Sequence, residues 1–138
     1  MNNLLISTKT TIKEAFKKLN KSGQKCLIVS DSKNILLGTL TDGDLRDAIL
    51  KGIKLDSTIK NYYQQNPTSV LKGGFNRKKI KQIFIKNLFD LIPVVDHKNK
   101  IIDVIFWKDI FKDKKNTKTL NLDVPVVIMA GGKGSRLE

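Results

Sequence analysis

The stretch Cys26–Leu45, CLIVSDSKNILLGTLTDGDL, is repeated 65 residues later by Leu91–Ile110, LIPVVDHKNKIIDVIFWKDI. Each copy has a run of apolar residues, a polar turn (DSKN or DHKN), a second apolar run and a segment of mixed polarity. Short apolar runs bounded by turn residues are typical of buried β-strands. The repeat therefore predicts two equivalent units, each with two strands joined by a tight turn and followed by a helix.

A further helix is expected before each strand pair, because apolar residues there recur every three to four positions. Thr11 and Glu14 form a capping-box pattern before the first of these helices, and Asn76 is a suitable N-cap for the second. Short extended segments, Leu4–Ile6 and Ser69–Leu71, precede both helices. The apolar helix positions are Ile12, Ala15, Phe16 and Leu19 in the first copy and Ile80, Ile83 and Phe84 in the second.

Together these segments predict an α/β (α+β) fold in which the order β-α-β-β-α occurs twice, at residues 1–60 and 61–112. A unit of about 60 residues buries too little apolar surface to be stable alone, so the copies should pack as a pseudo-twofold pair. The Lys-rich residues 113–123 are predicted to be a linker. An apolar strand and a glycine-rich loop follow at residues 124–138 and predict the beginning of another domain.

The chain is strongly basic, with 26 Lys and Arg residues, 13 Asp and Glu residues and a net charge of +13. Only Arg46, Arg77 and Arg136 are arginines, whereas proteins that read nucleic acid depend on the guanidinium group. We therefore attribute the charge to general lysine usage and expect no nucleic-acid partner.

The composition also limits the cellular context. No apolar run approaches the roughly 20 residues of a membrane span, and the amino end does not look like a signal peptide. Cys26 is the only cysteine, which fits a reducing compartment. His97 has no partner ligands nearby in the sequence, so no metal site is expected. These features predict a soluble, cytoplasmic protein without a membrane partner.

The segment GTLTDGDLR, Gly38–Arg46, is the most informative for function. Thr41 stands at the expected start of a helix, where unpaired N–H groups and the helix dipole bind phosphate, and its hydroxyl would add a hydrogen bond. Asp44 would accept hydrogen bonds from ribose hydroxyls, and Gly38 would let a ligand or a neighbouring backbone approach closely. Thr41 and Asp44 also form a capping box that only stabilises the helix. The residues alone leave both interpretations open.

The doubled unit, with Gly38, Thr41 and Asp44 at its second strand–helix junction, resembles a cystathionine-β-synthase (CBS) domain pair, or Bateman module. Such modules bind adenosine-containing ligands in clefts between the two copies and regulate an attached enzyme or channel. The resemblance implies an adenine nucleotide (AMP, ADP or ATP) whose phosphate meets Thr41 and whose ribose meets Asp44. Its base would lie near Ile28 and Thr8. Such pairs commonly associate, so a homodimer is expected.

The second copy departs from the family pattern. Asp109 keeps the ribose-type carboxylate, and Pro93 matches the proline that the family places at the start of this strand. Asp103 replaces the glycine, and Phe106 replaces the hydroxyl residue. We expect one competent site in the first copy and one degenerate site, where Phe106 or Trp107 either stacks on a base or packs in the core.

Residues 124–137, VPVVIMAGGKGSRL, resemble the amino-terminal signature of sugar-phosphate nucleotidylyltransferases, which make NDP-sugars. The resemblance implies a phosphate loop at Gly131, Gly132, Gly134 and Ser135, with Arg136 stabilising the pyrophosphate leaving group. It also implies that the chain is the amino-terminal part of a longer, Mg²⁺-dependent transferase. Within the 138 residues themselves we expect no catalytic residue, no cofactor and no metal.

These resemblances predict a regulatory, adenine-nucleotide-binding CBS module of a sugar-phosphate nucleotidylyltransferase. One alternative is a ligand-free dimerisation module. Another, for the full-length parent, is the NDP-sugar-forming transferase activity itself.

Overall fold

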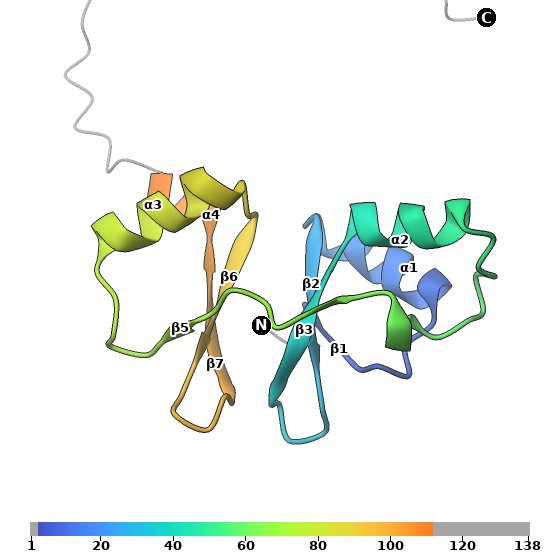
Figure 1. Ribbon diagram of the computed structural model, residues 1–138, viewed down its shortest axis with the longest axis horizontal. Coiled ribbons are helices and arrows are strands. Elements are labelled where there is room, and N and C mark those ends of the chain that lie inside the picture. The colour runs from blue at the N-terminus through green and yellow to red at the C-terminus, as the bar shows by residue number, and fades with distance from the viewer. Residues whose placement is uncertain (1–2, 112–138) are drawn as a thin grey trace, which may run out of the picture.

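The structure is a computed structural model that describes residues 3–111. The predicted linker (113–123) and the predicted start of a transferase domain (124–138) lie outside the described residues. The two repeats form the two halves of the molecule, with their long strands side by side at the centre (Figure 1).

The first repeat consists of β1 (Leu5–Ile6), α1 (Ile12–Ser22), β2 (Cys26–Ser30), β3 (Leu36–Thr41) and α2 (Asp42–Leu50). Strand β1 runs parallel to β2, and β2 runs antiparallel to β3. The connector to the second repeat contains a short 3-10 helix (Ile59–Asn61) and then β4 (Gln64–Gln65), which pairs with β3. The connector thereby completes a four-stranded sheet in the order β1-β2-β3-β4.

The second repeat consists of β5 (Val70–Leu71), α3 (Arg77–Asn87), β6 (Leu91–Val95), β7 (Ile101–Phe106) and α4 (Trp107–Phe111). Its three strands form a sheet in the order β5-β6-β7, again with one parallel and one antiparallel pair. The predicted order β-α-β-β-α is therefore present twice, which confirms the fold class.

The two hairpins are equivalent in detail. Each has a bulge at the same position, between the fourth and fifth residues of its first strand. In each turn an aspartate side chain, Asp31 or Asp96, accepts hydrogen bonds from two backbone N–H groups. The asparagine that follows, Asn34 or Asn99, has a left-handed backbone with φ of 62° or 59°. Asp and Asn are suited to these positions, so the polar tetrapeptides determine the turn geometry.

The helix starts are capped as predicted. Thr11 and Glu14 form a reciprocal capping box at α1, and the Asn76 side chain accepts a backbone N–H in the first turn of α3. The helix ends differ between the repeats. Gly23 ends α1 with φ of 63°, whereas Leu88, at the equivalent position after α3, adopts φ of 52° although it carries a side chain.

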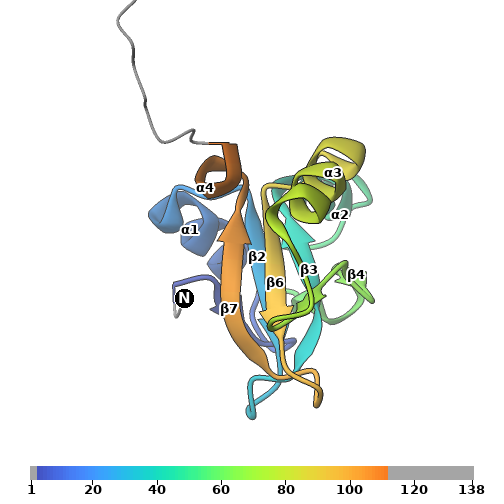
Figure 2. The ribbon, with the colours of Figure 1, turned by 90° about the vertical axis from the view of Figure 1, so that its left-hand side faces the viewer.

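The two repeats share one hydrophobic core. Leu27, Ile28 and Leu40 of the first repeat are fully buried, and Leu91 and Ile101 of the second pack in the same cluster. In a view from the side, α2 and α3 lie on one flank of the strands and α1 and α4 on the other (Figure 2). This arrangement confirms that the copies pack as a pseudo-twofold pair.

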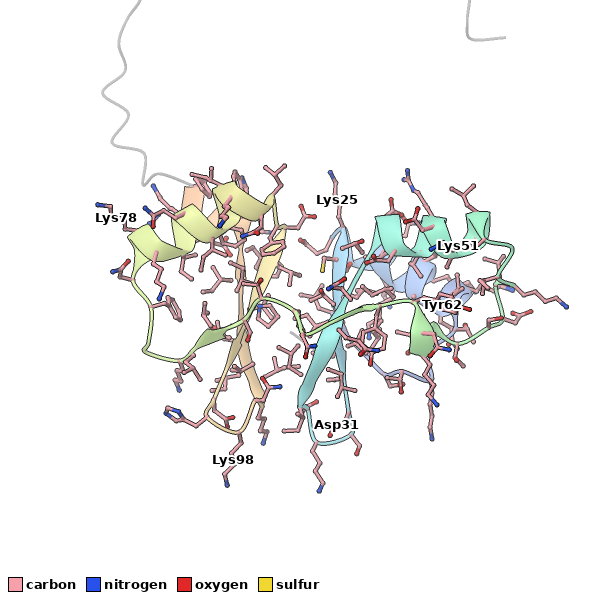
Figure 3. The ribbon with its side chains drawn as sticks, viewed as in Figure 1. Lys25, Asp31, Lys51, Tyr62, Lys78 and Lys98 are labelled. Carbon is pink, nitrogen blue, oxygen red and sulfur yellow. The ribbon has the colours of Figure 1, made fainter. Side chains whose placement is uncertain are left out.

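The hairpin turns bind each other directly. The Leu36 N–H donates to the Asn99 carbonyl, and the Ile101 N–H donates to the Asn34 carbonyl, both at 2.9 Å. The repeat offset exchanges these two bonds, so they obey the pseudo-twofold symmetry. The Asn99 side-chain amide adds a third bond, to the Leu36 carbonyl at 3.0 Å. Asp31 and Lys98 mark these two turns, which lie at the opposite end of the strands from the helices (Figure 3).

Candidate ligand pocket between the repeats

A pocket of about 330 Å³ lies where β3, β6 and the connector meet. The first repeat lines it with Cys26, Thr39, Thr41 and Asp44, the connector with Gln64, Pro67 and Thr68, and the second repeat with residues 88–91. These elements lie on the flank of α2 and α3 (Figure 2). The volume is at the lower end of the range of small-molecule sites.

Thr41 and Asp44 lie at the junction of β3 and α2 and are bonded to each other. The backbone N–H and the hydroxyl of Thr41 both donate to Oδ2 of Asp44 at 2.7 Å. The Asp44 N–H donates in return to Oγ1 of Thr41 at 3.2 Å. The pair is thus a capping box for α2. Because a hydroxyl has one proton, Thr41 in this conformation has none to donate to a phosphate.

Asp44 nevertheless keeps a free acceptor toward the pocket. Its second oxygen, Oδ1, accepts no hydrogen bond from any residue in the described range 3–111. A carboxylate held in this way is suited to accept hydrogen bonds from the two hydroxyls of a ribose. The geometry therefore shows the capping box that the sequence predicted, and it leaves one carboxylate oxygen of Asp44 without a partner among the described residues at a pocket that Asp44 lines.

The Cys26 thiol, which lines the pocket, has a raised pKa. Burial and, to a smaller extent, the nearby carboxylates of Asp90 and Asp44 raise the pKa of its thiol to about 12. The thiol is therefore protonated at neutral pH and contributes a small apolar surface.

Five other residues that the sequence proposed for ligand binding do not line this pocket. Ile28 and Pro93 are fully buried in the interior, Thr8 is half-buried before α1, and Asp109 is exposed in α4. Gly38 is buried beside the connector, where an added Cβ would lie 2.4 Å from a connector carbonyl oxygen. The close approach predicted for Gly38 is therefore made by neighbouring backbone.

The equivalent junction of the second repeat is occupied by aromatic side chains. The Trp107 ring stacks on Phe111 with 3.9 Å between centroids and meets Phe84 edge-on at 5.8 Å. Phe106 packs against the shared core. Of the two predicted roles for these rings, the structure shows packing against other side chains. The phosphate-loop residues predicted further along the chain, Gly131, Gly132, Gly134, Ser135 and Arg136, lie outside the described residues.

Sequence reasoning missed the part of the pocket contributed by the connector and by residues 88–91. A signal for the latter was present, because in a pseudo-twofold pair the start of β6 lies beside the start of β2. The sequence did not indicate that the connector lines the pocket, because the position of the connector depends on the pairing of β4 with β3.

No helix within residues 3–111 is long and apolar enough to cross a membrane. In the same range, no group of three or more His, Cys, Asp or Glu side chains is arranged to hold a metal ion.

Comparison with known proteins agrees with the doubled architecture. Residues 2–51 match the family model of the CBS domain. The CBS domains of a transcriptional regulator from Streptococcus pneumoniae superpose with a TM-score of 0.69, at 18% identity, over 81% of this chain and 90% of that one. Residues 3–111 have the fold of a CBS domain pair.

A second CBS domain pair of this fold has been solved with ligands. The pair of protein MJ0100, in complex with 5′-methylthioadenosine and S-adenosyl-L-methionine, superposes with a TM-score of 0.66 at 21% identity. The superposition covers 78% of this chain and 83% of that chain.

The curated relatives are longer than this chain. An uncharacterised protein of Rickettsia prowazekii is 32% identical over 106 residues, which are 77% of this chain and 32% of the relative. The chain spans about a third of the length of the curated relatives that it matches.

Proposed function

We propose that this chain is a regulatory module that binds an adenosine-containing ligand in the pocket between Asp44 and residues 88–91. The observation that carries the proposal is the free Oδ1 of Asp44, held by Thr41 at the edge of a pocket that both repeats and the connector line. The ribose would bind Asp44, and the base would lie against the apolar groups of Pro67, Phe89 and Leu91. The adenosine ligands of the MJ0100 pair support this ligand class.

Binding would regulate by stabilising one arrangement of the two repeats. The pocket wall comes from both repeats, so a ligand that fills it binds one relative orientation better than others and shifts the population toward it. In the parent protein this shift would change packing against an attached domain. The sequence at 124–137 supports a sugar-phosphate nucleotidylyltransferase as that domain, with Mg²⁺ as its metal. Pyrophosphate release by the longer protein, measured with and without adenosine, tests the connection.

Isothermal titration of the 138-residue chain with adenosine tests the site. The isosteric change Asp44→Asn replaces the carboxylate that would accept the ribose hydrogen bonds with a neutral amide. Because hydrogen bonds to charged groups are stronger than those to neutral groups, the change should weaken adenosine binding by about 10- to 100-fold. Asp47→Asn, on the exposed surface of the same helix, is the matched control and should bind normally. Urea denaturation of both variants checks the fold. Unchanged adenosine binding by a folded Asp44→Asn protein would disprove the assignment.

A ligand-free dimerisation module is the second candidate, and exposed apolar side chains favour it. Leu50 on α2 is 84% exposed, and Ile85 and Leu88 at α3 are 58% and 82% exposed, all on one flank of the strands. A homodimer through this flank would cover them. Sedimentation equilibrium with and without adenosine separates the candidates, because a purely structural dimer would form equally in both conditions.

A further inference from the structure

The pocket is acidic although the chain is basic. Among residues 3–111, those that line the pocket include two charged groups, the carboxylates of Asp44 and Asp90, and no lysine, arginine or histidine of this range lines it. The whole chain nevertheless has a net charge of +13. The excess of cations is therefore excluded from this surface.

The pseudo-twofold symmetry shows that the fold does not require this acidity. Asp90 is equivalent to Lys25, and the backbone carbonyl of each residue accepts a hydrogen bond from the first residue of the following helix. The Lys25 carbonyl accepts the Asp42 N–H at 3.1 Å, and the Asp90 carbonyl accepts the Trp107 N–H at 3.0 Å. Lys25 lines a separate cavity of about 490 Å³ and projects beyond the end of β2 (Figure 3). The same backbone position thus has opposite charges in the two halves.

The start of α2 does not offset the acidity. Its first N–H groups and its dipole would attract a phosphate in an uncapped helix. Here the Asp44 N–H already donates to Oγ1 of Thr41, and the Asp44 carboxylate itself lies in the first turn. The Asp42 carboxylate, also in the first turn, pairs with Arg46 at 2.6 Å. Burial is the main cause of the raised pKa of the Cys26 thiol, and the carboxylates of Asp90 and Asp44 add to it, as expected for two negative charges beside the pocket wall.

We infer that the pocket selects adenosine derivatives whose 5′ substituent is neutral or cationic, such as a thioether or a sulfonium, and discriminates against 5′-phosphates. The inference rests on the proposed function and specifies its ligand class. It differs from the expectation of AMP, ADP or ATP, because the described residues that line this pocket would offer a doubly charged phosphate two carboxylates and no cation. A lysine, Lys51, lines a second cavity that shares Asp44 and Gln64 with the pocket. One carboxylate at about a Debye length from such a phosphate weakens binding by about tenfold in physiological salt.

Titration of the 138-residue chain with 5′-methylthioadenosine, S-adenosylmethionine, AMP and ATP tests the selectivity. We expect the two sulfur compounds to bind at least about tenfold more tightly than AMP, and ATP to bind more weakly still. Raising the salt concentration should tighten AMP binding, because it screens repulsion. Equal or tighter binding of AMP would overturn the selectivity and leave the proposed function intact. Absence of binding by every adenosine compound would overturn the proposed function and this inference with it.

Asp90→Lys provides the decisive variant, because it installs the residue type that stands at the equivalent position of the first repeat. The Asp90 side chain is exposed and makes no hydrogen bond with any described residue, so the fold should tolerate the change. AMP should then bind as tightly as 5′-methylthioadenosine or more tightly. Asp56→Lys makes the same charge change at an exposed position that does not line the pocket and should leave the preference unchanged. Equal effects of the two variants would contradict the inference.

Discussion

Replacing Gly38 by alanine tests how the connector is held against the first repeat. An ideal Cβ at Gly38 would lie 2.4 Å from the Gln64 carbonyl oxygen and 2.4 Å from the Tyr63 ring. Neither contact is tolerable, so β4 must move away from β3, and the pairs Gly38–Gln65 and Thr39–Gln64 are lost. Overpacking costs about 1–3 kcal/mol, and each lost ladder bond adds about 1 kcal/mol. With two ladder pairs lost, we expect the free energy of unfolding to fall by about 3–5 kcal/mol.

The same change should also weaken ligand binding, because Gln64, Pro67 and Thr68 line the pocket and belong to the displaced segment. Urea denaturation followed by circular dichroism measures the stability, and titration with 5′-methylthioadenosine measures the binding. Gly43→Ala is the matched control. An added Cβ there meets only Thr41 Oγ1 at an ordinary 3.5 Å, and alanine suits a helix better than glycine by about 0.5–1 kcal/mol. If Gly38→Ala were as stable as the wild type, the described packing of the connector would be wrong.

Two further predictions concern the interior and the hairpin turns. Because the pKa of the Cys26 thiol is raised to about 12 in the folded protein, its contribution to stability is complete below pH 9 and is lost as the pH rises toward 12. Urea midpoints at pH 8 and pH 10.5 should therefore differ less for Cys26→Ala than for the wild type, and an equal difference would contradict the burial of the thiol. Asn99→Gly keeps the left-handed turn but removes the side-chain bond to Leu36, and should cost about 1 kcal/mol. The Asn34 side chain makes no such bond among the described residues, so Asn34→Gly should leave the free energy of unfolding unchanged. Equal unfolding free energies for the two variants would refute this role of Asn99.

The helix caps and hairpin turns could be predicted because their interactions are local. Thr11 with Glu14, and Thr41 with Asp44, are three residues apart, so their hydrogen bonds are visible in the sequence. Asp31 and Asp96 likewise bond backbone groups two and four residues ahead. The offset of the repeat then extended these local predictions to the order of the strands and the pairing of the two halves.

The contacts of the pocket could not be predicted in the same way. All five residues of β2 and all five of β6 are buried, so the strands have no polar alternation to indicate which side faces a ligand. The resemblance to CBS domains assigned Ile28 and Pro93 to the ligand, and both side chains lie in the interior. The end of α3 could not be predicted from the sequence either. Leu88 adopts a left-handed backbone conformation there, and glycine is the residue that usually indicates such a helix end.

The hydrogen bonds between the two hairpin turns join the two repeats at one end of the molecule. Strand β3 runs from the turn at Leu36 to the pocket at Thr41, about 17 Å away at the usual rise per residue. The helices lie at the end of the strands opposite to the turns (Figure 1), and Thr41, at that end of β3, lines the pocket. A rotation of about 5° between the halves, pivoting at the turns, would move the pocket walls by about 1.5 Å relative to each other over that length. For a given rotation about the turns, a pocket at this end of the strands changes its width more than one near the turns would.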